Sequence, residues 1–254
     1  MNAPFNKSAD LFLKYVDLKS RLSQEVPFLS NTFGAYQCKN LIEFGCGAGA
    51  HSAALAKAGF MIMATDYSDR LIQEAKTYTN ESMQVEKADL CQLPELIQKQ
   101  KYDGAYCIGN TLLLLPDSSM LKKALTNIHS ILKPGFPFIA HFINTDLCSE
   151  EKNRFGPIRS FPHEDGGELM LVKSFFPEYS EHHPGVSLMA IHRKESGESV
   201  VLEHHQNHFL DISPQDFSQM AKDVGFKNIK LLKNFSTDTF DPEKDISLTM
   251  VLEA

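Results

Sequence analysis

A strand, a tight turn and a helix are predicted around three alternating glycines, and this segment constrains the fold more than any other. The apolar run Leu41–Phe44 is typical of a buried strand, Gly45, Gly47 and Gly49 follow it, and residues 51–58 are rich in alanine. Glycine suits such a turn because it adopts backbone angles that other residues disfavour and lets main-chain N–H groups approach a ligand at a helix N-terminus. The segment therefore predicts a ligand site built from backbone.

Two families of nucleotide-binding enzyme use this arrangement. Residues 45–50 match G-x-G-x-x-G/A, the dinucleotide fingerprint, and Asp66 follows at about the 20-residue distance where a carboxylate binds a ribose hydroxyl. An NAD(P)-dependent oxidoreductase is therefore one hypothesis. Residues 43–49 also read E-x-G-x-G-x-G, in which Glu43 precedes the alternating glycines. The turn alone fits both patterns.

Composition limits the partners and the compartment. The 254 residues are 43% hydrophobic, enough for a sizeable core in one domain with an insertion. A net charge of -7 argues against a nucleic-acid partner. Five cysteines without a C-x-x-C pair disfavour a disulfide framework and a structural zinc site, which favours a cytoplasmic protein. Residues 1–10 are polar and no apolar stretch approaches 18 residues, so no membrane association is expected.

Acidic residues follow the next strands at the points where these strands end. Three further strands are predicted at residues 60–65, at 85–88 and from 102 to a break at 109–110. Asp66 follows the first, and Asp89 with Leu90 follows the second. Because ligands bind at the carboxyl ends of parallel strands, we expect Asp66 to bind ribose hydroxyls. Asp89 can accept the exocyclic amine of an adenine while Leu90 covers its ring.

The order of these features resembles motifs I to IV of the class I S-adenosylmethionine-dependent methyltransferases, over about residues 40–145. Residues 108–111 and 115–117, Ile-Gly-Asn-Thr and Leu-Pro-Asp, are similar to the glycine N-methyltransferase-like branch. The resemblance implies S-adenosyl-L-methionine as cofactor and Glu43 as the residue that positions the turn or contacts the cofactor's amino group. It implies that the cofactor-binding residues are Glu43, Gly45, Cys46, Gly47, Gly49, Asp66, Tyr67, Asp89, Leu90, Ile108 and Gly109.

The predicted fold is α/β, a doubly wound Rossmann-like sheet of seven strands, mostly parallel with an antiparallel last strand. We expect a single methyltransferase domain, 1–254, made of a helical leader or lid (1–36), a cofactor-binding half (37–144), an inserted antiparallel flap (145–212) and a C-terminal helix with the last strands (213–254). In the leader, helical spacing runs from residue 8 to 33 and Pro27 is expected to interrupt it. In the flap, strands are expected at 167–176, 186–193 and 199–210.

The substrate side is expected to include Tyr15, Asn110, His141 and the flap as catalytic or substrate-contacting elements. Tyr15 or Arg21 either packs the leader against the sheet or covers the bound cofactor. His141 lies in the predicted fifth strand and is either a core histidine or a base. No metal site is predicted, because the histidines at 182–183 and at 204, 205 and 208 lack an H-E-x-x-H pattern. The last three alternate between the two sides of a predicted strand. His204 or His208 could instead face the substrate.

The sequence thus predicts an S-adenosylmethionine-dependent methyltransferase that acts on a small molecule through an amine, hydroxyl or carbon nucleophile. Such an enzyme mainly holds the nucleophile in line with the methyl group and excludes water. The oxidoreductase remains an alternative, although Tyr67 and Tyr102 lack the lysine of a Tyr-x-x-x-Lys set. A second alternative is a protein that binds the cofactor without catalysis.

Overall fold

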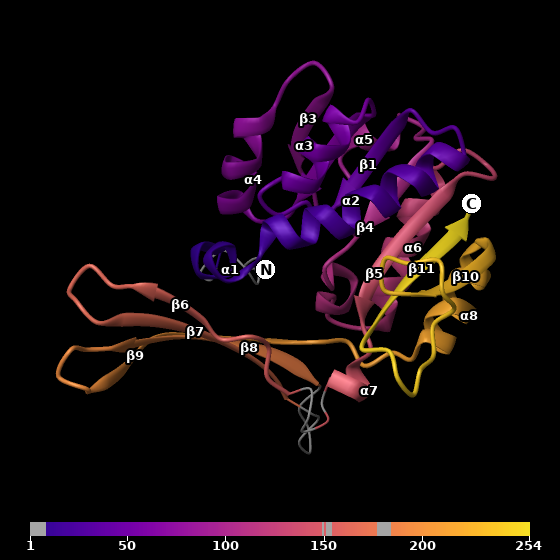
Figure 1. Cartoon of the computed structure of the whole chain (residues 1–254). Helices are drawn as coiled ribbons and strands as arrows, with labels where there is room; N and C mark the ends of the chain where they lie inside the picture. The colour runs from indigo at the N-terminus through magenta and orange to yellow at the C-terminus, as the bar shows by residue number, and fades with distance from the viewer. Residues whose placement is uncertain (1–8, 149, 151–153, 177–183) are drawn as a thin grey trace.

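A seven-stranded sheet with the order β10-β11-β5-β4-β1-β2-β3 forms the centre of the molecule (Figure 1). The computed structural model describes residues 9–148, 150, 154–176 and 184–254. The strands of this sheet are β1 (Asn40–Phe44), β2 (Met61–Asp66), β3 (Met83–Lys87), β4 (Gly104–Cys107), β5 (Pro137–Ile143), β10 (Lys227–Lys233) and β11 (Ser247–Glu253). β1 to β5 run parallel, and β11 is antiparallel to both of its neighbours. The predicted mostly parallel sheet with an antiparallel last strand is confirmed.

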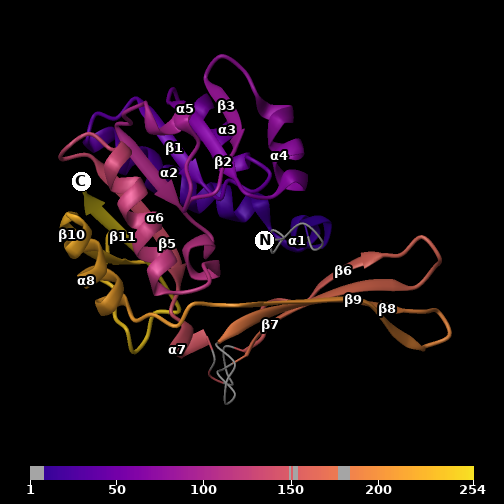
Figure 2. The same cartoon turned by 180° about the vertical axis from the view of Figure 1, so that it is seen from behind.

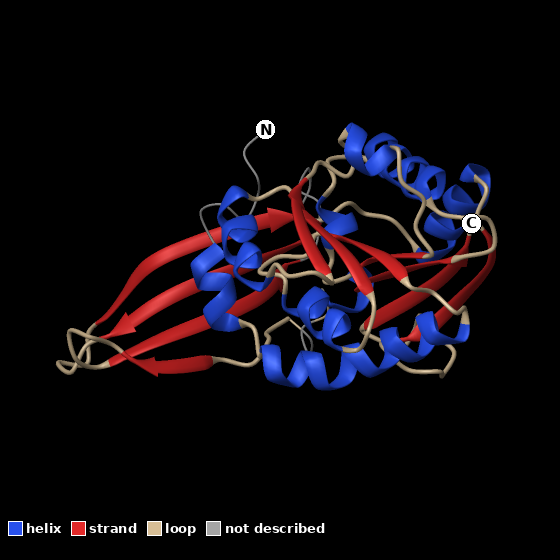
Figure 3. Ribbon diagram, turned by 90° about the horizontal axis from the view of Figure 1, so that it is seen from above, coloured by secondary structure: helices blue, strands red, loops and turns tan. Residues whose placement is uncertain are grey.

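Helices cover both faces of this sheet, as the view from above shows (Figure 3). One face packs against α2 (Leu18–Ala35), α3 (Ala50–Lys57) and α4 (Asp69–Ala75). The other packs against α5 (Glu95–Gln98), α6 (Ser118–Ile131) and α8 (Pro214–Val224). Short helical turns lie at η1 (Lys76–Tyr78), η2 (Thr111–Leu114) and α7 (Thr145–Cys148). Two apolar clusters, one on each face, therefore hold the strand ends at a common edge.

A second sheet with the order β6-β7-β8-β9 follows β5 and projects away from the first (Figures 1 and 2). Its strands are β6 (Arg159–Pro162), β7 (Glu168–Phe176), β8 (Gly185–Arg193) and β9 (Ser199–His208). All neighbouring pairs are antiparallel, so the predicted flap is confirmed. The hairpin turn between β8 and β9 closes through the Lys194 N–H, which donates to the Glu198 carbonyl at 2.8 Å. The sequence missed β6, which has only four residues and is mostly exposed.

The leader forms two helices, α1 (Ala9–Tyr15) and α2, but they are not separated at Pro27 as predicted. The break lies at residues 16–17, where the Asp17 side chain accepts the Ser20 N–H at 3.1 Å and caps α2. Pro27 lies inside α2, although proline removes one helical hydrogen bond. Complete burial of Leu29 and Phe33 on the next turns outweighs that local cost.

Helix α1 lies against the flap. Leu11 and Tyr15 pack with Leu171, Leu188 and Ala190 from β7 and β8 in one small apolar cluster. The leader is therefore in contact with the flap through α1 and with the large sheet through α2. Within the described part of the chain, the helices are all too short or too polar to span a membrane.

Candidate active site

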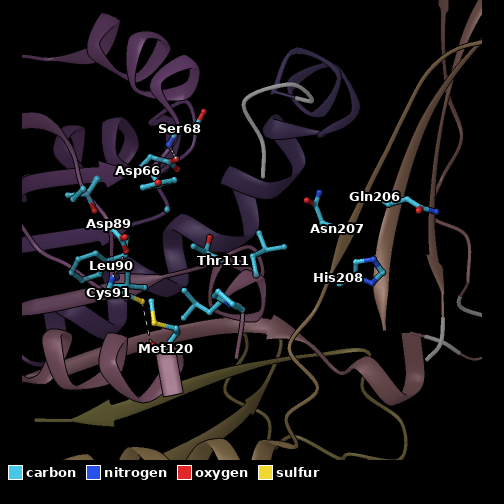
Figure 4. A pocket seen from close by; sticks show the side chains of 18 residues that line it. Asp66, Ser68, Asp89, Leu90, Cys91, Thr111, Met120, Gln206, Asn207 and His208 are labelled. Atoms are coloured by element: carbon cyan, nitrogen blue, oxygen red, sulfur yellow. Dashed lines mark hydrogen bonds between the residues drawn. The ribbon is translucent and has the colours of Figure 1, made fainter. Parts of the chain in front are cut away.

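A cavity with a volume of about 530 Å³ lies at the carboxyl ends of the strands. We call it the large cavity. Asp66 and Asp89 line it from the β2 and β3 sides, and Asn207 faces them from β9 (Figure 4). The Asp89 Oδ1 accepts the Cys91 N–H at 2.8 Å, and the Leu90 carbonyl accepts the Asn127 side-chain amide at 2.9 Å. These bonds fix the turn that presents both predicted adenine-contacting residues, Asp89 and Leu90, to the cavity.

Asp66 lies where the large cavity meets a second one. Its Oδ2 accepts the Gly47 N–H at 2.8 Å, and its Oδ1 accepts the Ser68 N–H at 2.8 Å. Burial raises the pKa of the Asp66 carboxyl, although hydrogen bonds from the Ser68, Gly47 and Tyr67 backbone oppose that rise. A carboxylate has about four lone-pair directions. Asp66 can therefore fix the glycine turn and still accept hydrogen bonds from a ligand.

The second cavity, of about 120 Å³, is bordered by the glycine turn, and we call it the glycine-turn cavity. Gly45 has a φ of +70°, and a Cβ there would lie 2.4 Å from the Thr111 Oγ1. The predicted need for glycine is therefore confirmed at this position by both angle and space. Three N–H groups of the turn, however, already have acceptors within the protein. Cys46 donates to the Thr65 carbonyl, Gly47 to the Asp66 carboxylate and Gly49 to the Cys46 carbonyl. These three donors stabilise the turn itself and are not directed at a ligand.

Glu43 is 1% exposed and also borders the glycine-turn cavity. Its carboxylate accepts hydrogen bonds from the Ser52 hydroxyl and, at 3.1 Å, from the Tyr106 hydroxyl. Burial raises the pKa of Glu43, with nearby His51 and these two bonds acting in the opposite direction. Because Ser52 belongs to α3 and Tyr106 to β4, Glu43 connects the elements on either side of the turn.

The sequence missed one acidic residue, Glu25, which binds the predicted lid residue Arg21. The Arg21 Nε and Nη2 donate to the two Glu25 oxygens at 2.7 and 2.9 Å, and the His51 Nε2 lies 2.9 Å from Glu25 Oε2. Burial raises the pKa of Glu25, but the hydrogen bonds from His51 and Arg21 outweigh it and lower the pKa to about 2. Arg21 lines the glycine-turn cavity, next to Gly109. The spacing of four residues between Arg21 and Glu25 was the available sequence signal.

A third cavity, of about 50 Å³, lies between α1, the segment after β4 and the flap, and we call it the flap cavity. It brings together Tyr15 and Asn110, two of the three predicted substrate-side residues. The Tyr15 hydroxyl donates to the Pro157 carbonyl at 3.0 Å, and burial raises its pKa. The Asn110 Oδ1 accepts the Ile143 N–H at 2.9 Å, which connects the segment after β4 to the end of β5.

His141 lies elsewhere, in the core. Its ring stacks on Phe235 with centroids 4.4 Å apart, and burial lowers its pKa to about 4. His141 is not among the residues that line the three cavities. His141 therefore fits the first of its two predicted alternatives, a core histidine. The geometry does not support a role as a base.

The flap histidines lie on a strand, as predicted. The side of β9 that faces the flap cavity, however, is the side of His205 and not the side of His204 and His208. His205 and Asn207 line it, whereas His204 is exposed and its Nε2 lies 2.8 Å from the Ser187 hydroxyl. His208 borders the large cavity. His182 and His183 lie outside the described residues. Among the residues that are described, no group of three His, Cys, Asp or Glu could hold a metal ion.

The three cavities meet around residues 109–114. Asp66 and Thr111 line both the large and the glycine-turn cavities, while Gly109 lines both the glycine-turn and flap cavities. Leu114 lines both the large and flap cavities. One extended ligand and a second, smaller molecule can therefore come into contact beside this segment.

Known proteins with a similar sequence match only part of this chain. Residues 41–135 match a family model described as a methyltransferase domain. Mouse glycine N-methyltransferase is 27% identical over 143 residues, which cover 51% of this chain and 49% of that protein. A ubiquinone biosynthesis O-methyltransferase of Coxiella burnetii is 33% identical over 111 residues, which cover 43% and 45%. The chain thus spans about half the length of the curated relatives it matches.

The similarity in fold extends over the whole chain. The CcbJ methyltransferase of Streptomyces caelestis superposes with a TM-score of 0.75 at 15% identity and covers 100% of this chain and 98% of its own. Residues 41–135 therefore match a methyltransferase domain, and the strand order and the fold similarity agree with the class I S-adenosylmethionine-dependent methyltransferases. The predicted resemblance is confirmed, and it favours this class over the oxidoreductases.

Proposed function

We propose that this protein binds S-adenosylmethionine and transfers its methyl group to a small-molecule acceptor. The observation that carries this proposal is the meeting of three cavities beside residues 109–114, with Asp66 at the junction of the two larger ones. A nucleoside joined to an amino acid needs two such connected cavities, and an acceptor needs a third that opens beside them.

The nucleoside part would occupy the large cavity. Asp89 would accept the exocyclic amine of adenine and Leu90 would cover the ring, because both residues line that cavity next to each other. Asp66 would accept the ribose hydroxyls with the lone pairs that Gly47 and Ser68 leave available. Tyr67 borders the same cavity and would contact the ribose.

The amino-acid part would occupy the glycine-turn cavity, which contains charges of both signs. Arg21 would bind the carboxylate, since Glu25 holds its guanidinium in a fixed orientation on the cavity wall. Glu43 lines the same cavity and would contact the amino group, directly or through the turn that it supports. Ile108 and Gly109 would form the remaining wall.

The cofactor supplies an activated methyl group on a positively charged sulfur. The protein's own contribution would be to hold the acceptor atom in line with that group and to exclude water. Tyr15 and Asn110 would contact the acceptor, because they line the flap cavity beside Gly109. A general base is needed only for an acceptor that arrives protonated.

Calorimetry with S-adenosylhomocysteine, adenosine and NAD tests the binding proposal. We expect S-adenosylhomocysteine to bind more tightly than adenosine and NAD not to bind. Substitution Arg21→Met should weaken binding of S-adenosylhomocysteine by about 1.5–3 kcal/mol, the contribution of a hydrogen bond to a charged group, and leave adenosine unaffected. Tighter binding of NAD than of S-adenosylhomocysteine would support the oxidoreductase instead.

A transfer assay with radiolabelled methyl cofactor tests the activity. We expect label in a panel of amines, phenols and acids to appear only with the protein present. Binding of the cofactor without transfer to any acceptor would favour the non-catalytic binding protein.

A further inference from the structure

The flap cavity is too small to hold a whole acceptor molecule. Its volume of about 50 Å³ leaves room for only about four water-sized groups. Under the proposed function it would take the reacting end of the acceptor, and the rest of the molecule would extend into the large cavity of about 530 Å³. Leu114 and Asn207 line both cavities, so this extension would pass beside them. Among the described residues of the flap, Asn207 alone lines both.

Asn207 is held in a fixed position near the end of β9. Its backbone pairs with Val186 of β8 in the antiparallel register of the flap. Three residues further on, the N–H of buried Leu210 donates to the Leu113 carbonyl at 2.7 Å. These bonds fix the position of Asn207 relative to residues 109–114, where the three cavities meet.

The other polar side chains that line the flap cavity already contact groups of the protein. Their contacts are hydrogen bonds, an ion pair and a cation–π contact, made by Tyr15, Asn110, His205 and Lys173. Asn207 differs, because its carboxamide makes no hydrogen bond within the described part of the chain. The side chain is half-buried and faces Asp66 and Asp89 across the large cavity (Figure 4). Of these five polar side chains, Asn207 can therefore bind a ligand without breaking a contact of the protein.

A carboxamide is uncharged and offers donors and an acceptor side by side. Its nitrogen donates two hydrogen bonds and its oxygen accepts. A hydroxyl or carboxamide group of a ligand can use both atoms. A carboxylate could use only the nitrogen and an ammonium only the oxygen, and neither would gain an opposite charge from Asn207. The proposed function uses Asp66 and Asp89 for the cofactor, and the described lining of the large cavity includes no lysine or arginine.

We infer, on the basis of the proposed function, that Asn207 determines acceptor specificity by binding an uncharged hydroxyl or carboxamide group of the acceptor. This group is distinct from the atom that receives the methyl group. The reacting atom would lie on the other side of the junction, beside Gly109, which lines both the glycine-turn and flap cavities. An acceptor with a carboxylate or an ammonium opposite Asn207 would bind more weakly.

Four straight-chain probes of similar length test this inference: butanamide, butan-1-ol, butanoate and butan-1-amine. Their Kd values are measured by NMR titration at pH 7 with the protein saturated with S-adenosylhomocysteine. At this pH the acid is a carboxylate and the amine is an ammonium. We expect both uncharged probes to bind at least fivefold more tightly than either charged probe. A smaller preference, tighter binding of a charged probe, or no binding of any of the four would overturn the inference.

Two substitutions test the role of Asn207 itself. Asn207→Leu should weaken binding of butanamide about tenfold, because the hydrogen bonds to the carboxamide are lost, and leave the Kd of S-adenosylhomocysteine unchanged. Asn207→Asp keeps the size of the side chain and adds a negative charge, so butan-1-amine should become the tightest probe. A purely structural role would weaken all four probes without changing their order.

The matched control is Gln219→Leu, which removes an exposed carboxamide of α8 that donates to Asp223 at 2.9 Å. It should leave all four Kd values unchanged. An unchanged order of the probes in Asn207→Asp, or unchanged butanamide binding in Asn207→Leu, would refute the role of Asn207. Failure of S-adenosylhomocysteine to bind the unaltered protein would refute the proposed function instead, so the two failures are distinguishable.

Discussion

Glu25 is expected to contribute to stability as much as a major core residue, because it is a buried carboxylate that holds two basic side chains. Its side chain is 7% exposed and that of Arg21 is 30% exposed. Replacing one partner of a buried pair leaves the other charge unpaired and costs about 3–5 kcal/mol. Since Arg21 is partly exposed, Glu25→Gln should lower the free energy of unfolding by an amount near the lower end, about 3 kcal/mol.

The pH dependence provides a second route to the same magnitude. The pKa of Glu25 falls from 4.5 to about 2 on folding. Each pKa unit corresponds to about 1.4 kcal/mol, so the shift corresponds to about 3 kcal/mol. Because the folded-state pKa is the lower one, this stability is present above about pH 4.5 and is lost as the pH falls toward 2.

Urea unfolding at pH 7, 4.5 and 3 measures both effects. The matched control is Glu74→Gln, because Glu74 pairs with Arg70 at the same i,i+4 spacing but is 43% exposed. An exposed pair of this kind contributes about 0.3–0.5 kcal/mol. If Glu25→Gln costs no more than Glu74→Gln, or if the decline between pH 4.5 and 3 is the same in Glu25→Gln and the unaltered protein, Glu25 does not have this role.

Three further predictions concern the turn, the core and the ribose contact. Gly45→Ala should reduce S-adenosylhomocysteine binding and Tm more than Gly47→Ala, because both positions have positive φ but only Gly45 has Thr111 where the Cβ would lie; equal losses would contradict the steric reasoning. The free energy of unfolding should fall as the pH decreases from 6.5 toward 4, because His141 has a folded-state pKa of about 4. In His141→Phe this fall should be smaller by about 2–3 kcal/mol, as unfolding measurements at several pH values would show. An identical pH dependence in both proteins would show that His141 does not resist protonation. Asp66→Asn should weaken binding of both S-adenosylhomocysteine and adenosine by about 1–3 kcal/mol in calorimetry, and unchanged affinity would mean that the ribose assignment is wrong.

Elements that depend on neighbouring residues in the chain could be predicted from the sequence. The alternating glycines define the turn because their backbone angles are local, and positive φ values at Gly45, Gly47 and Gly49 agree. A serine just before a helix is a typical cap, and the Ser68 Oγ accepts the Leu71 N–H at 3.3 Å at the start of α4. The mostly parallel sheet follows from the alternation of such strands with helices.

Features that depend on packing between distant segments could not be predicted. Pro27 is tolerated in α2 because Phe33 is buried against the sheet, which no local pattern indicates. The side of β9 that faces the flap cavity depends on how the flap leaves the large sheet, so no local pattern favours His205 over His204. Glu25 was missed because its role depends on His51, a residue of α3 that approaches α2 only in the fold.

The same distinction separates the cofactor side of the site from the acceptor side. Asp66 is the last residue of β2 and Asp89 follows β3, both within the segment that matches the methyltransferase domain, so their proposed role could be inferred from the order of the strands. Tyr15 and Lys173 come from α1 and β7 and meet only because the flap packs on the leader. Since Tyr15 lines neither of the two proposed cofactor cavities, a substitution there should change the acceptor's KM and leave the affinity for the cofactor unchanged.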